Sequence, residues 1–163
     1  MTSLPAPGRS SHGDAGRRTR PGQAAKLARV LPAGLSGADL ILALRGLAIA
    51  GACLPGGERW LSRAMELLTQ ELPQQILADG GHCERSPTRH LGVLRDLVDI
   101  KSMLHAAGRE LPTELQVAIE SMGPTLRLFQ HGDGGLTLFN GSQAEEGFKV
   151  DMVLRRANAR RKP

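Results

Sequence analysis

Apolar side chains between residues 37 and 129 recur three or four positions apart, which is the spacing of one face of an α-helix. Clusters of Pro and Gly divide this stretch into segments. The first predicted helix covers 37–54 and is apolar on nearly every face, so we expect it to be buried on all sides. The second covers 58–77, where an apolar stripe runs from Trp60 to Ile76.

Two more helices follow the second one. The third begins at Ser86 and Pro87, a capping residue followed by a proline at the first helical position, and ends before Gly108. The fourth covers 112–129, where Pro124 predicts a kink or a break. Short connections favour antiparallel neighbours. We therefore predict an all-α fold in which residues 30–130 form antiparallel helical hairpins with little strand.

The apolar period changes after residue 130. Gly and Asp at 132–135 predict a turn, and Leu-Thr-Leu-Phe at 136–139 predicts a short extended segment. We assign 131–154 to this turn and exit segment and 155–163 to a basic tail, although 147–163 has the composition to begin another helix. Residues 1–29 offer little to bury and are predicted to be a disordered basic N-terminal tail.

The net charge of +5 is unevenly distributed. Residues 1–29 carry six Lys or Arg and one Asp, and 155–163 carry five Lys or Arg and no acid, whereas 30–154 carry ten basic and fifteen acidic residues. A domain that grips phosphates would carry its positive charge on the folded surface. Nucleic-acid binding is therefore an alternative that rests on the two tails alone.

One loop gathers most of the polar chemistry. Residues 79–90 read Asp-Gly-Gly-His-Cys-Glu-Arg-Ser-Pro-Thr-Arg-His and end in the predicted start of the third helix. Free N–H groups at a helix start favour anions, so Glu84, Arg85, Arg89 and His90 are candidate substrate-binding residues. A well-capped helix start with structural ion pairs is the alternative explanation of the same residues. The spacing fits no zinc site, and we expect no metal and no cofactor.

This run resembles the signature Asp-Gly-Gly-His-Phe-Glu-Arg-Ser-Pro-x-Tyr-His of heparinase II/III-type polysaccharide lyases. The helix from Gly37 resembles a family helix that starts with Gly-Asn-His, and the 132–142 run resembles the segment that leaves the family's helical domain. The resemblance covers residues 30–154. It implies part of an incomplete α/α toroid that is followed in the family by a β-sandwich domain.

The resemblance also implies a chemistry, namely the cleavage of uronate-containing polysaccharides by β-elimination. Family members neutralise the uronate carboxylate with Asn or His and protonate the leaving oxygen with the Tyr of the motif. Here Arg89 stands at the Tyr position, and Ala38 and Asp39 stand at the Asn-His positions. His82 and His90 remain as the nearby groups that titrate in a suitable range, so no catalytic residue is assigned beyond these two candidates.

We therefore expect a truncated heparinase II/III-like protein that lacks the sandwich domain and is inactive alone. Two alternatives stay open: a non-catalytic domain that binds an acidic glycan or a protein partner, and a small helical protein whose basic tails bind nucleic acid. Self-association through an uncovered apolar helix face is a further expectation. The sequence shows no signal peptide and no apolar run long enough for a membrane span, which predicts a cytoplasmic chain, although the family is often periplasmic or secreted.

Overall fold

The computed structural model describes residues 19–158, which form six helices. The helices are α1 (Thr19–Val30), α2 (Gly37–Cys53), α3 (Glu58–Gln75), α4 (Pro87–Ala106), α5 (Thr113–Leu128) and α6 (Gly147–Asn158). The described part of the chain contains no named strand, only two isolated bridges. The predicted all-α fold of helical hairpins is confirmed.

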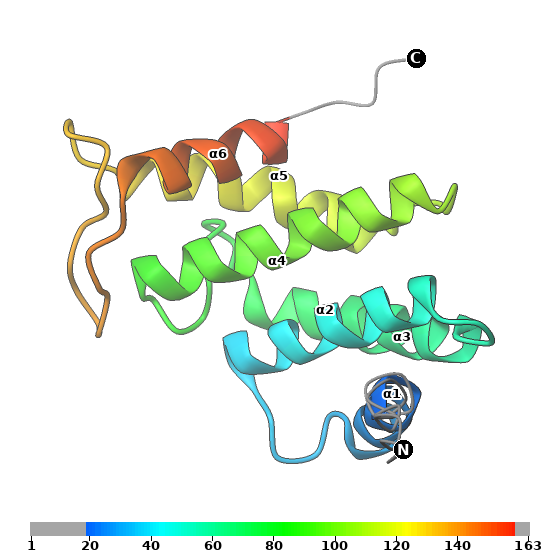
Figure 1. Ribbon diagram of the computed structural model, residues 1–163. Helices are drawn as coiled ribbons and strands as arrows, with labels where there is room; N and C mark the ends of the chain where they lie inside the picture. The colour runs from blue at the N-terminus through cyan, green and yellow to red at the C-terminus, as the bar shows by residue number, and fades with distance from the viewer. Residues whose placement is uncertain (1–18, 159–163) are drawn as a thin grey trace, which may run out of the picture.

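The helices form two layers (Figure 1). In one layer α4 lies between α2 and α6 and contacts both, and the three helices run in the same direction. In the second layer α3 and α5 contact each other and run antiparallel to the first layer. Helix α1 packs against α2 and α3 at one end of the array. Alternation between two layers through short turns is how hairpins build an α/α toroid segment.

The core lies between these layers and is almost entirely aliphatic. Leu44, Leu68, Leu94, Leu97 and Leu126 are fully buried. Since the sequence contains only three Phe, one Trp and no Tyr, leucine supplies most of the volume that aromatic side chains fill in other proteins. The predicted stripes of the four central helices therefore face inward as expected. The prediction that helix α2 is buried on all sides is wrong at Leu42, which is 46 % exposed.

The two ends of the described chain differ from the prediction. Residues 19–29, predicted to belong to the disordered tail 1–29, are part of α1, which packs through Ala24 and the half-buried Leu27. Residues 147–158 form α6, which crosses the predicted boundary between the exit segment 131–154 and the basic tail 155–163. Val150, Val153 and Leu154 are buried against α4 and α5, and this apolar face explains why the segment folds. Residues 1–18 and 159–163 lie outside the described residues.

Smaller differences concern turns and prolines. Helix α5 runs through Pro124 without a break, so the alternative of two separate helices is wrong. The segment 136–139 holds one bridging residue, Leu136, which pairs with Gln130 and is buried. No helix among the described residues has the length and apolar character needed to cross a membrane.

Candidate functional site

The loop that joins α3 to α4 is a tight turn pressed against α5. Leu77 N–H donates to the Gly81 carbonyl, and Thr125 Oγ1 donates to the Asp79 carbonyl at 2.8 Å. Gly80 has φ +75, and a Cβ there would collide with the Ser121 carbonyl of α5. Only glycine fits this left-handed position so close to a neighbouring helix. Gly80 therefore fixes the path of the loop against α5.

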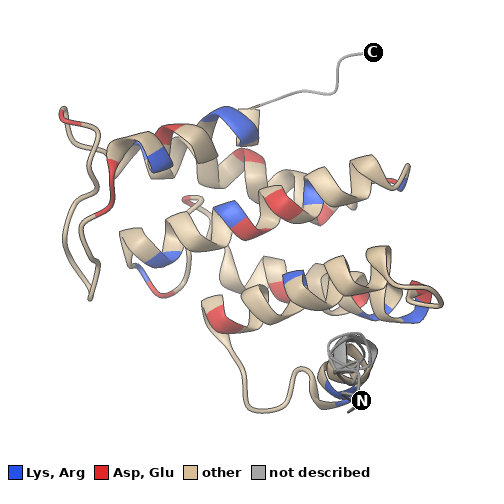
Figure 2. Ribbon diagram, viewed as in Figure 1, with Lys and Arg blue, Asp and Glu red and all other residues tan. Residues whose placement is uncertain are grey.

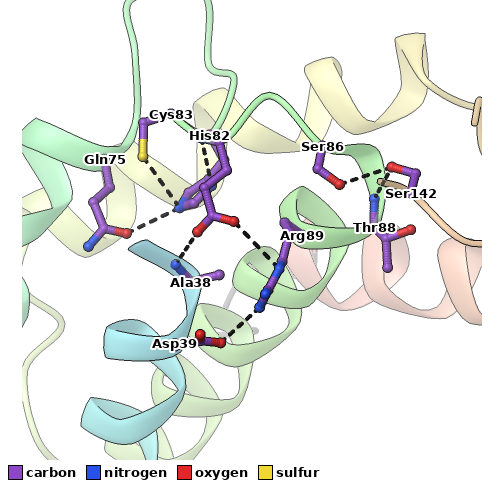
Figure 3. Close-up of polar contacts among 10 residues, drawn as sticks. Ala38, Asp39, Gln75, His82, Cys83, Ser86, Thr88, Arg89 and Ser142 are labelled. Atoms are coloured by element: carbon purple, nitrogen blue, oxygen red, sulfur yellow. Dashed lines mark hydrogen bonds and ion pairs between the residues drawn. The ribbon is translucent and has the colours of Figure 1, made fainter. Parts of the chain in front are cut away.

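His82 is buried at the base of this loop, with 1 % of its surface exposed. Its Nδ1 accepts the Glu84 N–H at 3.4 Å, and its Nε2 lies 3.1 Å from Gln75 Oε1 (Figure 3). Since Nδ1 accepts a hydrogen bond, the proton of the neutral ring is on Nε2 and is donated to Gln75. Burial lowers the pKa of His82 below its ordinary value. The ring thus serves as a neutral link between the end of α3 and the loop.

His90 contacts the main chain of His82 and is equally buried. Its Nδ1 accepts the His82 N–H at 3.3 Å, its Nε2 donates to the Met122 carbonyl at 3.0 Å, and its ring meets Phe129 edge-on. Burial lowers the pKa of His90 to about 4. The ring nitrogens of both candidate histidines are therefore engaged within the protein. The structure does not bring His90 to a surface where a substrate could contact it, nor His82 to a position for proton transfer.

Glu84 holds the start of α2. Its Oε1 accepts the Ala38 N–H at 2.7 Å, which satisfies one of the free donors at that helix terminus. Gly37 has φ +55, and a Cβ there would collide with the same carboxylate oxygen. The carboxylate supplies the capping contact, since the side chain of the N-cap residue Ser36 makes no capping bond. Glu84 is therefore placed as a helix cap rather than as a free ligand group.

Arg89 joins the two helices whose residues the resemblance singles out. Its guanidinium donates to Asp39 Oδ1 at 2.8 Å, and its Nε lies 3.5 Å from Glu84 Oε2 (Figure 3). Asp39 and Arg89 are 60 % and 49 % exposed. The structure thus brings together the positions of the family's Asn-His and Tyr. In this chain, Asp39 and Arg89 occupy these positions and form an ion pair.

Arg85 and the first turn of α4 contact other parts of the protein, namely Asp79 and Ser142. Arg85 has φ 53 and pairs with Asp79, whose pKa it holds below the ordinary value. Ser142 Oγ accepts the Thr88 N–H at 3.2 Å and lies 3.0 Å from Ser86 Oγ (Figure 3). The predicted anion site at this helix start is therefore occupied by the segment between α5 and α6. Ser142 is not among the predicted site residues, although it follows the Asn140-Gly141 turn of the 132–142 segment.

A groove of about 590 Å³ opens beside the Asp39–Arg89 pair. It lies over α4, between α2 and α6, and the segment 141–145 contributes to its lining. Its lining carries charged residues of both signs: Asp39, Arg89, Arg95, Asp96, Glu145 and Lys149. Figure 2 likewise shows positive and negative positions interspersed along α4 and α6. No group of three or more His, Cys, Asp or Glu residues in 19–158 is arranged to hold a metal ion.

Comparisons with known proteins agree with this architecture. The chain is 36% identical over 108 residues to FtsZ-localized protein C of Caulobacter vibrioides, which is 65% of this chain and 19% of that protein. It is 25% identical over 120 residues to a heparin-sulfate lyase of Bacteroides thetaiotaomicron, covering 66% of this chain and 17% of that protein. The chain thus spans about a fifth of the length of these curated relatives.

A solved structure of heparinase III matches with a TM-score of 0.75 at 23% identity, over 84% of this chain and 22% of that one. At this identity the match shows a shared fold. The family model described as heparinase II/III N-terminus matches residues 23–158, nearly the whole of the described chain. By this match, this protein belongs to the heparinase II/III family and represents the helical N-terminal region of that family.

Proposed function

We propose that this domain keeps the helical scaffold of the heparinase II/III family without its β-elimination chemistry and acts as a binding domain. The observation that carries the proposal is the contact of Arg89 with Asp39 and Glu84. A guanidinium stays protonated at any working pH and cannot give a proton to a leaving glycosidic oxygen. A carboxylate at position 39 supplies negative charge where the reaction needs a uronate carboxylate to be neutralised.

The two histidines do not supply the missing proton transfer. A general acid has to lie within hydrogen-bond reach of the reacting oxygen. His82 and His90 are each 1 % exposed. The His82 ring nitrogens bond to Gln75 Oε1 and the Glu84 N–H, and the His90 ring nitrogens bond to the Met122 carbonyl and the main-chain N–H of His82. Charging either ring would also break a bond in which a ring nitrogen accepts. These contacts support a structural role for both rings.

Binding of an acidic glycan is the second candidate, and the exposure of Arg85 and Arg89 favours it. Each of these two side chains is 49% exposed, Arg85 on the loop and Arg89 at the groove. A uronate would have to displace Asp79 from Arg85 or Asp39 from Arg89, so we expect such binding to be weak and to fall steeply with added salt. This chain covers about a fifth of the longer relatives, so their activities belong to proteins with much additional sequence.

The test is an assay for the unsaturated uronate that β-elimination creates. The full chain is incubated with heparin, heparan sulfate, alginate and hyaluronan, and the ultraviolet absorbance of the product is followed, with heparinase III as the positive control. We expect no product from any polymer. Product formation that is abolished in His82→Gln or His90→Gln, while both variants keep the wild-type circular dichroism, would refute the proposal.

A further inference from the structure

A second groove, of about 400 Å³, lies between the last turn of α3 and the first half of α5. Its lining is mainly apolar: Val117 is 57 % exposed, Pro73 is exposed and Ile76 is half-buried. Glu114 is the one charged residue that the described part of the chain contributes to this lining. A groove between two helices that is apolar and carries one acidic charge is suited to a helix that presents apolar and basic side chains.

No third helix among the described residues covers this groove. Helix α3 ends at Gln75, and the turn after it folds back on α5, where Thr125 Oγ1 donates to the Asp79 carbonyl. Apart from α3, the described helices that α5 contacts are α4 and α6, which lie in the first layer. The side chain of Val117 is therefore left in water, and its burial by a partner would be favourable.

Helix α1 presents the complementary chemistry on its exposed face. Lys26, Arg29 and Val30 are spaced three and four positions apart, so they share one face of the helix. Both basic side chains are exposed, and Val30 is 50 % exposed. Helix α1 contains no acidic residue, and neither Lys26 nor Arg29 forms an ion pair with any described residue. An apolar side chain between two uncompensated cations is therefore available for contact.

The two surfaces lie at different ends of the array (Figure 1). Helix α1 contacts α2 and α3, whereas α5 lies at the other end with α6, and α1 makes no contact with α5 of its own chain. The charges of the chain favour a contact between copies, because residues 30–154 carry fifteen acidic and ten basic residues while 19–30 carry basic residues and no acid. Within α5 the acidic residue of the first turn, Glu114, lies at the groove and the basic residue of the last turn, Arg127, lies outside it.

We propose that the groove between α3 and α5 is a self-assembly surface that receives the exposed face of α1 from a second copy of this chain. In this contact Val30 of one copy packs on Val117 of the next, and Arg29 lies beside Glu114. The contact joins two different surfaces, so each copy keeps one surface of each kind free, and association continues into chains or closes into rings. It involves neither the signature loop nor the groove over α4, and it therefore goes beyond the proposed binding function.

The experiment is sedimentation velocity on the full chain, from micromolar to near-millimolar concentration and at low and high salt. We expect the average mass to rise with concentration beyond that of a dimer, and to rise less in high salt because the charged part of the contact is screened. Val117→Asp should weaken the association at least roughly tenfold, since it removes the apolar contact and places a second acidic charge in the groove. Its matched control is Leu128→Asp, at an 82 % exposed position of the same helix outside the groove, which should leave the association unchanged.

A charge exchange tests the pairing of the two surfaces. Arg29→Glu and Glu114→Lys should each weaken the association roughly fivefold, and the chain that carries both changes should recover it, because the opposite charges again meet between copies. Arg127→Glu is the control for Arg29→Glu, since it changes the net charge equally at an exposed position outside the groove. Circular dichroism checks that every variant keeps the helical content of the unmodified chain.

Three results would overturn the inference. The first is a chain that stays monomeric over the whole concentration range. The second is an association that Val117→Asp leaves unchanged, or that Leu128→Asp and Arg127→Glu weaken as strongly as the changes at the two surfaces. The third is Arg29→Glu that releases the chain from DNA while the self-association persists, which would assign the basic face of α1 to nucleic acid.

Discussion

The signature loop divides into a buried half and an exposed half, and the two halves have different roles. The buried half consists of Gly80, His82 and His90, whose polar groups are satisfied inside the protein and which fit the family motif. The exposed half consists of Arg85 and Arg89, whose side chains form ion pairs at the surface. The two departures from the motif, Cys83 and Arg89, are both exposed. Residues that hold the fold are retained, and the residue that would carry the chemistry differs.

The largest expected effect comes from breaking the buried half. His90→Ala leaves the His82 N–H without a partner, removes the hydrogen bond to the Met122 carbonyl and opens a cavity beside Phe129. We expect a loss of about 3 kcal/mol in the free energy of unfolding, measured by urea denaturation. His105→Ala is the control, because His105 is exposed on α4, and it should change stability by less than about 0.5 kcal/mol. Equal effects of the two changes would mean that the buried half is not structural.

The same half should make stability depend on pH. The folded-state pKa of His90 is lowered to about 4, and that of His82 is also lowered, whereas both rings titrate near 6.5 when unfolded. Between these values the unfolded chain binds more protons than the folded one, so stability is full above pH 6.5 and falls as the pH drops toward 4. Each histidine contributes a slope of up to about 1.4 kcal/mol per pH unit. Denaturant midpoints that stay constant from pH 7 to 4.5 would contradict this burial.

The exposed half should contribute far less. A double-mutant cycle of Asp39→Asn and Arg89→Gln isolates the ion pair between α2 and α4. Because the two side chains are 60 % and 49 % exposed, we expect a coupling of about 0.2–1 kcal/mol that shrinks in high salt. Chemical denaturation at two salt concentrations measures it. A coupling above about 2 kcal/mol, independent of salt, would show that this pair is as structural as the histidines.

The sequence predicts the central helices well, because the apolar segments 37–53 and 87–106 are bounded by Pro and Gly residues that mark the helix ends. It fails to predict the helices at the two ends of the described chain. Helix α1 contains Arg20 and Pro21 near its start and has few bulky apolar residues, so its packing through Ala24 depends on the tertiary context of α2 and α3. Local propensity does not contain that information.

In the candidate site, too, the local sequence identifies the residues but does not predict contacts between residues far apart in the chain. The motif identifies the loop and its residues, but the Asp39–Arg89 contact joins positions 50 residues apart. Taken separately, an arginine and an aspartate at a helix start suggest a ligand-binding cation and a repelling anion. Only the packing of α2 against α4 shows that they neutralise each other. The burial of His82 and His90 is equally invisible locally, since histidines in a polar loop are as compatible with exposure.

The division of the loop is tested most directly by observing the two histidine rings. Long-range proton–nitrogen correlation spectra of the full chain report the tautomer and the pKa of His82 and His90 together. We expect both rings to be neutral at pH 7 with the proton on Nε2, and both pKa values to lie below 6.5, with that of His90 at about 4. A ring that carries its proton on Nδ1, or that titrates near 6.5 and shifts when a polysaccharide is added, would contradict the structural assignment and return that histidine to the list of catalytic candidates.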